Sequence, residues 1–281
     1  MIHVRGFCIL QNLNFENKKI NIIHNNDSES YTTASLLREK LSQRGYIVPE
    51  GYDYDAMLNI CVGGDGAFLR TVHNYGFPEI PFVGINTGHL GFFQEVSPKN
   101  LEEFIDKLDN KEFSIDCLYL VEALVCTRTS CIDLIGVNEI VIKGIESKTI
   151  HLNISIKDTY LERFSGDGVI ISTPMGSTAY NFSAGGSIVY PTLGVLQLTP
   201  LAPINSKVYR SLTTSSIVPR NMSIKLSPEY RDENSILIVV DGKQHIYENI
   251  VEINLKISNM KIQMLNLGKH NFWTNVRDKF L

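Results

Sequence analysis

The chain has 281 residues, of which 43% are hydrophobic, so it can form one large domain or two ordinary ones around a sizeable core. Its net charge of −4 and its sequence pI of about 6.0, without a basic run, argue against non-specific binding to nucleic acid. No apolar run approaches the roughly 20 residues of a membrane span, and the N-terminus lacks the apolar region of a signal peptide. We therefore expect a cytoplasmic protein that binds neither membrane nor nucleic acid.

The cysteines are expected to be buried thiols. The chain has five of them and no C-x-x-C pair, and most lie in apolar, strand-like contexts, which indicates a reducing compartment. A zinc site built on Cys126 and Cys131 is not expected, because a matching second pair of ligands is missing. The five are Cys8, Cys61, Cys117, Cys126 and Cys131.

The first part of the chain alternates expected strands with expected helices. Such alternation implies an α/β domain, assigned to residues 1–112, with a parallel sheet and a ligand at the carboxyl ends of its strands. The expected strands are 19–24, 56–62 and 81–86, and the expected helices are 30–44, 67–73 and 98–108.

A glycine-rich turn, Gly63-Gly64-Asp65-Gly66, joins the second strand to the second helix. A strand that leads into a helix through glycines can bring backbone N–H groups against a phosphate. Asp65 has the wrong charge to attract phosphate, so it must accept a proton, accept a hydrogen bond or hold a cation. The alternative is an ordinary tight turn, because Asp-Gly is a common turn pair and the motif matches neither the dinucleotide fingerprint nor the P-loop.

After about residue 112 the hydrophobic residues alternate with polar ones, as in half-buried strands. The alternation is clearest over 150–157, 222–226 and 251–258, and it predicts a mostly β, sandwich-like domain over 113–258. Residues 271–281 read as a short helix, and the segment 259–281 is expected to pack back on the first domain.

Three further stretches are unusually polar or rich in glycine. Residues 84–92 form a second loop at a strand end, or simply an ordinary loop. Asn138 and Glu139 interrupt an apolar strand, where burial without partners would cost free energy. Either a bulge, a strand end or a solvated edge exposes them, or they bind a ligand such as a ribose, whose hydroxyls suit a carboxylate and a carboxamide.

The third stretch, 166–186, is the densest in serine, threonine and glycine. Ser177 and Thr178 are expected to cap a helix. Neither Ser177 nor Ser183 lies in the G-x-S-x-G motif of a hydrolase nucleophile. Residues 241–244 follow an apolar run and read most simply as a hairpin turn.

These motifs, in their order along the chain, resemble those of the NAD kinase family. That family is related to the diacylglycerol kinase and phosphofructokinase group. The most specific is the Ser-Thr-Pro stretch, whereas lipid kinases share the first motif. The motifs are residues 63–66, 86–92, 138–139 and 168–180. The resemblance implies an α/β domain followed by a mostly β domain in a homo-oligomer, dimeric or tetrameric. It implies phosphorylation of the 2′-hydroxyl of the adenosine ribose of NAD to give NADP, with ATP, or in some members polyphosphate, and with Mg²⁺.

The resemblance also assigns residues, with Asp65 as the proton acceptor and no set of protein metal ligands. The phosphate-facing residues are Gly63, Gly64, Gly66 and Arg70. Substrate contacts to the ribose, adenosine and adenine are Phe92, Asn138, Glu139, Thr178, Ala179, Tyr180, Asn181 and Ser183. Contacts toward the nicotinamide, in part across a subunit boundary, are Asp167 and Ala202, and Gln244 takes the place of a late family glutamine.

Two residues depart from the family pattern. Met175 stands where threonine or serine is common, and Lys243 separates Gln244 from the preceding Asp-Gly pair. Because the chain lacks a P-loop lysine, metal and backbone amides are expected to neutralise most of the phosphate charge. Two alternatives stay open: a lipid kinase, disfavoured by the polar stretch 166–186, and a non-catalytic NAD-binding sensor, disfavoured by the presence of Asp65.

Overall fold

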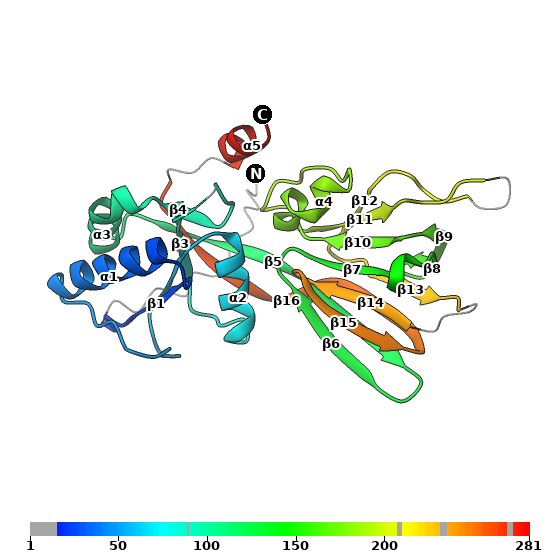
Figure 1. Ribbon diagram of the computed structural model, residues 1–281, viewed down its shortest axis with the longest axis horizontal. Coiled ribbons are helices and arrows are strands. Elements are labelled where there is room, and N and C mark those ends of the chain that lie inside the picture. The colour runs from blue at the N-terminus through cyan, green and yellow to red at the C-terminus, as the bar shows by residue number, and fades with distance from the viewer. Residues whose placement is uncertain (1–15, 89, 207–209, 231–234, 269–271) are drawn as a thin grey trace, which may run out of the picture. The chain divides into compact units, whose positions relative to one another are not determined.

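The computed structural model describes residues 16–88, 90–206, 210–230, 235–268 and 272–281 (Figure 1). The chain divides into two compact units. Unit 1 comprises Met1–Leu118 and Lys261–Leu281, so its second segment follows unit 2 in the sequence. Unit 2 is the single segment Tyr119–Met260.

Unit 1 is an α/β unit with a parallel sheet. Strands β1 (Ile20–His24), β2 (Leu58–Val62) and β3 (Phe82–Ile85) are neighbours in that order, and β4 (Gln94–Val96) extends the sheet from β3. The end of β16 (Ile250–Asn266) also pairs with β3, in parallel, through Met264 and Phe82. The helices are α1 (Ser28–Gln43), α2 (Asp65–Asn74), α3 (Leu101–Asp109), which the short turn η1 (Pro98–Asn100) precedes, and α5 (Phe272–Phe280).

The core of unit 1 forms where apolar side chains of the helices meet the sheet. Leu37 of α1 and Phe104 of α3 pack with Ile60 and Val83 of the central strands. Helix α1 begins where Asp27 accepts a hydrogen bond from the Ser30 N–H, at 2.8 Å. This packing places the carboxyl ends of β2 and β3 side by side.

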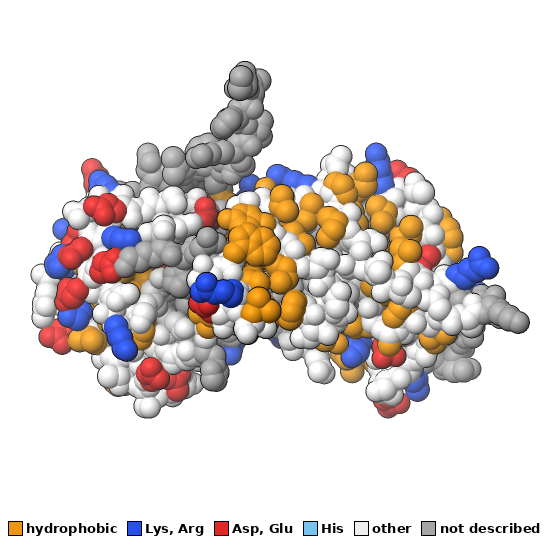
Figure 2. All heavy atoms as spheres, turned by 90° about the horizontal axis from the view of Figure 1, so that it is seen from above, with side chains coloured by type: hydrophobic (Ala, Val, Ile, Leu, Met, Phe, Trp, Pro, Cys, Tyr) orange, Lys and Arg blue, Asp and Glu red, His pale blue; other side chains and the backbone are white. Residues whose placement is uncertain are grey.

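Charged side chains of both signs cover the outer side of α1 and α3. The Arg44 guanidinium lies 2.7 Å from Asp106 and 2.9 Å from Asp109, and Lys40 pairs with Glu102. Figure 2 shows acidic and basic side chains mixed over this end of unit 1. Because the two signs alternate, this face carries no extended field of one charge.

Unit 2 is built of antiparallel strands, with a large hydrophobic core between its layers. Six of them form a sheet in the order β12 (Ser216–Pro219), β11 (Val195–Leu201), β10 (Gly168–Ser172), β7 (Glu139–Gly144), β14 (Ser235–Val240) and β15 (Lys243–Glu248). A second layer contains β9 (Thr159–Gly166), β8 (Ile150–Ile156), β13 (Ile224–Pro228) and the first part of β16, and β5 (Ser114–Thr127) pairs with β6 (Cys131–Gly136). Short helical turns are η2 (Ile145–Ser147), η3 (Met175–Thr178) and α4 (Tyr180–Ser183).

The alternation of apolar and polar residues explains which side chains of the second layer of unit 2 are buried. Ile150, Leu152 and Ile154 are buried, and they share a core with Ile171 and Ile238 of the six-stranded sheet. The predicted fold class, an α/β unit with a mostly parallel sheet and a strand-rich unit, is confirmed.

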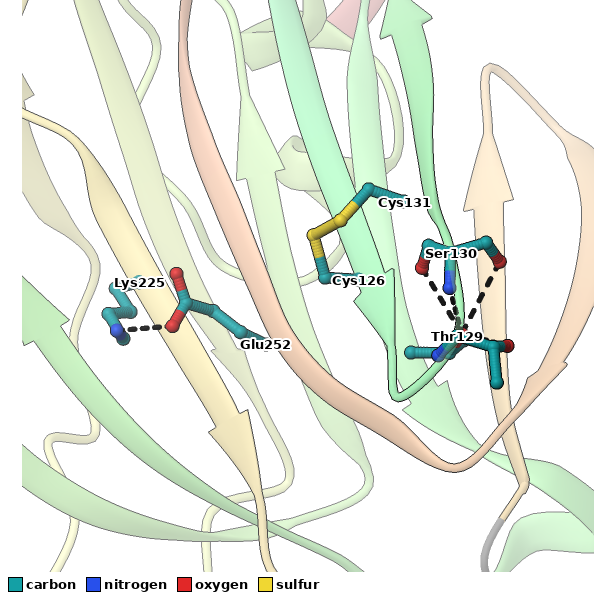
Figure 3. Close-up of a disulfide and its surroundings, with 7 residues drawn as sticks. Cys126, Thr129, Ser130, Cys131, Lys225 and Glu252 are labelled. Carbon is teal, nitrogen blue, oxygen red and sulfur yellow. Dashed lines mark hydrogen bonds and ion pairs between the residues drawn. A yellow bond between two sulfur atoms is a disulfide. The ribbon is translucent and has the colours of Figure 1, made fainter.

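The expectation that the cysteines are thiols is wrong for three of them. Cys126 and Cys131 face each other across β5 and β6, with Cα atoms 4.1 Å apart, and form a disulfide (Figure 3). Cys117 is also disulfide-bonded. Cys61 is a free, buried thiol, and burial raises its pKa to about 12. Strand register, which spacing alone does not give, brings Cys126 and Cys131 together, so the inference of a reducing compartment loses its support; Cys8 lies outside the described residues.

A substitution at Gly84 can test how closely the chain after β3 packs on this strand. A Cβ at Gly84 would lie 2.3 Å from the carbonyl oxygen of Phe93 and 2.9 Å from the Cα of Gln94. Gly84→Ala should therefore lower the free energy of unfolding by about 1–3 kcal/mol, measured by urea denaturation. Gly51→Ala is the control, since a Cβ at that glycine meets nothing within 4 Å. Equal stability of the two variants would show that the loop moves away from β3 at no cost.

Candidate functional site

The glycine turn of unit 1 brings the start of α2 to the end of β2. Gly63 has a φ of 150°, and a Cβ on it would lie 2.7 Å from that of Ala67, so the position requires glycine. Gly64 is the N-cap of α2 and Asp65 is its first residue. Gly64 has no side chain to cap this helix start, and a helix N-terminus favours an anion.

Asp65 ties this turn to the loop between β3 and β4. Its Oδ1 accepts hydrogen bonds from the Phe92 and Phe93 N–H groups, at 2.9 and 3.1 Å. Its Oδ2 lies 3.6 Å from Nζ of Lys279, and 27% of the side chain is exposed. Of the roles considered from sequence, hydrogen-bond acceptor is thus observed, and an exposed edge of the carboxylate remains for another partner.

Gly91 allows the carboxylate and Gln94 to approach the loop. A Cβ on Gly91 would lie 2.3 Å from Asp65 Oδ1 and 1.8 Å from Gln94 Oε1, so both oxygens converge on this point. Gln94 is buried, and its Oε1 has no hydrogen-bond partner among the residues described here. Gln94 was not predicted from the sequence; its position shortly after the motif 86–92 was the available signal. His89 of that motif lies outside the described residues.

The C-terminal helix α5 contacts the same loop. The Phe92 ring has its centroid 5.9 Å from that of Phe272 and 6.0 Å from that of Phe280. The Lys279 ammonium lies 4.9 Å from the centroid of the Phe92 ring. The sequence predicted this helix, but it did not predict that Lys279 would lie beside Asp65.

Arg70, on α2, turns toward the end of β1. Its guanidinium donates a hydrogen bond to the side-chain oxygen of Asn25. The two residues line a cavity of about 110 Å³ together with His24, Thr71 and neighbouring side chains. The structure therefore places Arg70 near the glycine turn, with its charged group already hydrogen-bonded.

In unit 2, Asn138 and Glu139 lie at the beginning of β7, between β10 and β14. Each is only 7% exposed, so the alternative of a solvated strand edge is excluded. Asn138 Oδ1 and Glu139 Oε2 are buried and accept no hydrogen bond from any described residue. Burial, with the nearby charge of Asp241 as a second cause, raises the pKa of Glu139 to about 8. Unpartnered acceptors on two neighbouring buried residues are available to a hydroxyl-bearing ligand.

Asp241 fixes the backbone of this pair. Its carboxylate accepts hydrogen bonds from the N–H groups of Val137 and Asn138, both at 2.7 Å, and of Glu139, at 3.2 Å. Asp241 and Gly242 form the turn between β14 and β15, with φ values of 46° and 85°. The predicted hairpin turn is confirmed, whereas the role of the carboxylate was missed. Gln244 lies on β15, exposed at the edge of the sheet.

The Ser-Thr-Pro stretch packs directly on Asn138. Thr173 donates its N–H to the Asn138 carbonyl at 2.8 Å and its hydroxyl to the Val137 carbonyl at 2.7 Å. A Cβ on Gly176 would lie 2.0 Å from the Asn138 carbonyl oxygen, so glycine is required for this approach. Two motifs of the sequence analysis thus meet within unit 2.

The expected helix capping by Ser177 and Thr178 is wrong. The Ser177 hydroxyl hydrogen-bonds the backbone of Val189, at 2.9 and 3.2 Å, and Thr178 donates to the Met175 carbonyl at 3.1 Å. Ala179 precedes α4 and makes no side-chain cap. The Ser177 hydroxyl is used by Val189, beyond the η3 turn, and the Thr178 hydroxyl is used inside that turn, which a capping argument based on residue type does not anticipate.

The remaining adenine candidates differ in exposure. Thr178 is buried, Ala179 is half-buried, and Tyr180 and Ser183 are exposed. Asn181 is fully buried; it accepts from the Thr199 hydroxyl at 2.6 Å and donates to the Ser177 carbonyl at 3.4 Å. The amide of Asn181 therefore holds the loop together.

Asp167 and Ala202 are neighbours but do not join the Asn138 group. The Asp167 N–H donates to the Leu201 carbonyl at 3.0 Å, and both Asp167 and Ala202 are exposed. In β10 Gly168 pairs with Lys143, while Ser172, at the other end, pairs with Glu139. The nicotinamide candidates thus lie at the opposite end of β10 from the ribose candidates.

Within the described ranges, no group of three or more His, Cys, Asp or Glu side chains is arranged to hold a metal ion. The described helices include none that is long and apolar enough to cross a membrane.

Comparison with known proteins gives a consistent match over most of the chain. Residues 12–113 match the ATP-NAD kinase N-terminal domain, and residues 137–266 match the ATP-NAD kinase C-terminal domain. The NAD kinase of Finegoldia magna is 45% identical over 96% of this chain and 100% of its own length. That of Streptococcus gordonii is 35% identical over 94% of this chain and 96% of its own.

Two solved structures share the fold. An NAD kinase from Archaeoglobus fulgidus in complex with ATP has a TM-score of 0.76 at 24% identity, covering 92% of this chain and 98% of its own. A yeast NADH kinase complexed with NADH has a TM-score of 0.78 at 20% identity, covering 92% and 86%. The chain belongs to the NAD kinase family, so the lipid-kinase alternative is set aside.

The raised pKa of Glu139 makes stability depend on pH. The folded chain keeps a proton that the unfolded chain releases between the ordinary value of 4.5 and about 8. The free energy of unfolding should therefore fall as pH rises through that window, by up to roughly 1.4 kcal/mol per pH unit, and level off above it. Glu139→Gln removes this titration. In urea denaturation, the free energy of unfolding of the variant should therefore rise relative to that of the wild type as pH increases across the window. Glu39→Gln, at an exposed position of α1, is the control, and parallel curves for Glu139→Gln and wild type would contradict the assignment.

Proposed function

We propose that this chain transfers the γ-phosphoryl group of ATP to the 2′-hydroxyl of the adenosine ribose of NAD and so produces NADP. The observation that carries the proposal is the 45% identity to the Finegoldia magna NAD kinase over almost the whole chain. The carboxylate of Asp65, beside a glycine turn, and the unpartnered acceptors of Asn138 and Glu139 support it in chemical terms.

Unit 1 would bind the phosphates and supply the base. Gly63, whose N–H donates to the Ile85 carbonyl, shapes the turn, and Gly64 and Gly66 would bring backbone N–H groups close to the nucleotide. Arg70 adds a positive charge on the first turns of α2. Asp65 keeps Oδ1 fixed by two N–H groups and uses its exposed edge to orient the ribose hydroxyl. It accepts the hydroxyl proton late, as the new bond to phosphorus forms.

The donor set fits Mg²⁺. This ion usually keeps several waters and is held by one or two protein oxygens together with substrate phosphates. Asp65 and the unpartnered Gln94 Oε1 would provide these oxygens, since both converge on Gly91. When bound, Mg²⁺ neutralises phosphate charge and orients the transferred group.

Unit 2 would bind the adenosine part of NAD. Asn138 Oδ1 and Glu139 Oε2 accept hydrogen bonds from ribose hydroxyls, which removes the cost of their burial. With a pKa of about 8, Glu139 is mostly protonated at neutral pH in the free protein, so it can also donate. Within unit 2, the small or hydroxyl-bearing residues Thr178, Ala179, Tyr180 and Ser183 would contact the adenine, and Gln244 stays a proposed contact at the sheet edge. Phe92 stays a proposed substrate contact of unit 1.

The separation of Asp167 and Ala202 from the ribose candidates supports an oligomer. Because they lie at the other end of β10, a second copy of the chain would supply them to the nicotinamide end of a bound NAD. We propose a dimer or tetramer on this basis, with ATP as the donor and polyphosphate as a further donor to be tested.

The direct test supplies the purified protein with ATP, Mg²⁺ and NAD and reads NADP with an NADP-specific dehydrogenase. Reactions with polyphosphate in place of ATP, with NADH in place of NAD, and with EDTA define the donor, the acceptor and the metal. Label from the γ-phosphate that enters a lipid and never NADP would contradict the proposal, as would binding of NAD without any transfer.

Asp65→Asn tests the proton acceptor. The amide keeps an oxygen for the Phe92 and Phe93 N–H groups but cannot take a proton, so kcat should fall by roughly 10²–10⁴ while NAD binding and the melting temperature change little. Asp55→Asn, at an exposed loop position, is the control. Recovery of the rate at high Mg²⁺ would indicate that Asp65 acts mainly by holding the metal and is not the proton acceptor. Loss of stability together with binding would indicate a purely structural acceptor.

Ala179→Leu tests the adenine contact. The larger side chain should raise the KM for NAD by about tenfold or more, because overpacking commonly costs roughly 1–3 kcal/mol. Ala179→Ser keeps the position small and should bind NAD nearly as well as wild type. An unchanged KM for the leucine variant would remove Ala179 from the pocket.

A further inference from the structure

We propose that Lys279 is a further catalytic residue, whose ammonium binds an oxygen of the phosphoryl group as it passes to the acceptor hydroxyl beside Asp65. This inference rests on the proposed function. It supplies the protein charge that the sequence lacks in its glycine turn, because no lysine follows Gly66 as it would in a P-loop.

The position of Lys279 carries the inference. Its Nζ lies 3.6 Å from Asp65 Oδ2 and 4.9 Å from the centroid of the Phe92 ring. At 3.6 Å the ion pair is longer than a good hydrogen bond, and an ammonium has three donors. Within the described part of the chain these are its two recorded contacts, so donors remain for an oxygen that enters between Asp65 and the helix.

Helix α5 holds this ammonium in place. Phe272 and Phe280, at its two ends, both contact the Phe92 ring, and Val276 between them is buried. The Lys279 side chain is 33% exposed, so most of it is covered while part of it stays accessible to solvent. The neighbouring charges on α5, Arg277 and Asp278, pair with each other at 2.7 Å and leave Asp65 as the charged partner of Lys279.

The geometry of transfer brings phosphate oxygens to this ammonium. A hydroxyl that Asp65 activates lies at hydrogen-bond distance from its carboxylate, and the γ-phosphorus must approach that hydroxyl to about 3–3.5 Å before reaction. Since Nζ is 3.6 Å from Asp65 Oδ2, oxygens of the phosphoryl group come within its reach. Arg70 already hydrogen-bonds Asn25, which leaves Lys279 as the better placed cation beside the carboxylate.

The step balances without any change in the lysine. The ribose oxygen forms a bond to the γ-phosphorus, the bond from that phosphorus to the β,γ-bridging oxygen breaks, and ADP leaves with the electron pair. The hydroxyl proton passes to Asp65. Lys279 stays protonated and stabilises the charge on the transferred group, as fixed donors do at other developing charges.

The test compares Lys279→Met, which keeps length and an apolar stem, with Lys279→Arg, which keeps the charge. The methionine variant should lose roughly 10²-fold in kcat, with the KM for NAD and the melting temperature little changed, and arginine should recover most of that loss. Arg277→Met is the matched control on the same helix, since Arg277 is 67% exposed and paired with Asp278.

The kcat values of the wild type and of the Lys279 variants support or overturn the role of Lys279. If the wild type makes no NADP, the proposed function fails first. If it does and Lys279→Met keeps the wild-type kcat, the inference is overturned; it is likewise overturned if the variant is faster, which would make the ion pair a restraint on Asp65. If Lys279→Met also melts lower, the arginine variant decides: recovery of kcat supports the inference, and failure to recover overturns it.

Discussion

The carboxylate of Asp65 and the two N–H groups that it binds hold the candidate site of unit 1 together. In a parallel sheet the loops after neighbouring strands emerge at the same edge, but nothing in the sheet itself fixes their mutual distance. Here the Phe92 and Phe93 N–H groups bind Asp65 Oδ1, and Gly91 leaves the space for this approach. Charge-assisted hydrogen bonds of this kind are stronger than neutral ones, so a single side chain fixes both loops and remains partly exposed for chemistry.

Unit 2 also has an aspartate whose carboxylate binds backbone N–H groups. Asp241 binds the N–H groups of Val137, Asn138 and Glu139, and Thr173 and Gly176 pack on the same backbone from the other side. The backbone is therefore held from two directions, while the side-chain oxygens of Asn138 and Glu139 stay without partners. A backbone held in this way keeps these two buried acceptors in fixed positions.

The sequence predicted those features that local pattern controls. Apolar runs and glycine turns located β2, α2 and β3, and alternation located β8 and β16, because both patterns depend on neighbours in the chain. Features that depend on register or on distant segments were missed: the Cys126–Cys131 disulfide, the clamp made by Asp241, and Gln94 and Lys279 beside Asp65. The capping assigned to Ser177 failed for the same reason, since its partner is Val189, beyond the turn.

The divided sequence of unit 1 bears on the order in which the chain folds during synthesis. Strand β3 pairs with Met264 of β16, which is synthesised much later. Lys107 donates a hydrogen bond to the carbonyl of Leu267, 160 residues further along. Unit 2 is contiguous, so the ribosome completes all of it before these parts of unit 1 emerge. The usual N-terminal-first order therefore cannot hold for the finished units. Until translation passes residue 267, the edge of β3 that later binds β16 lacks this partner, and the nascent chain carries an open strand edge of the kind on which chaperones act.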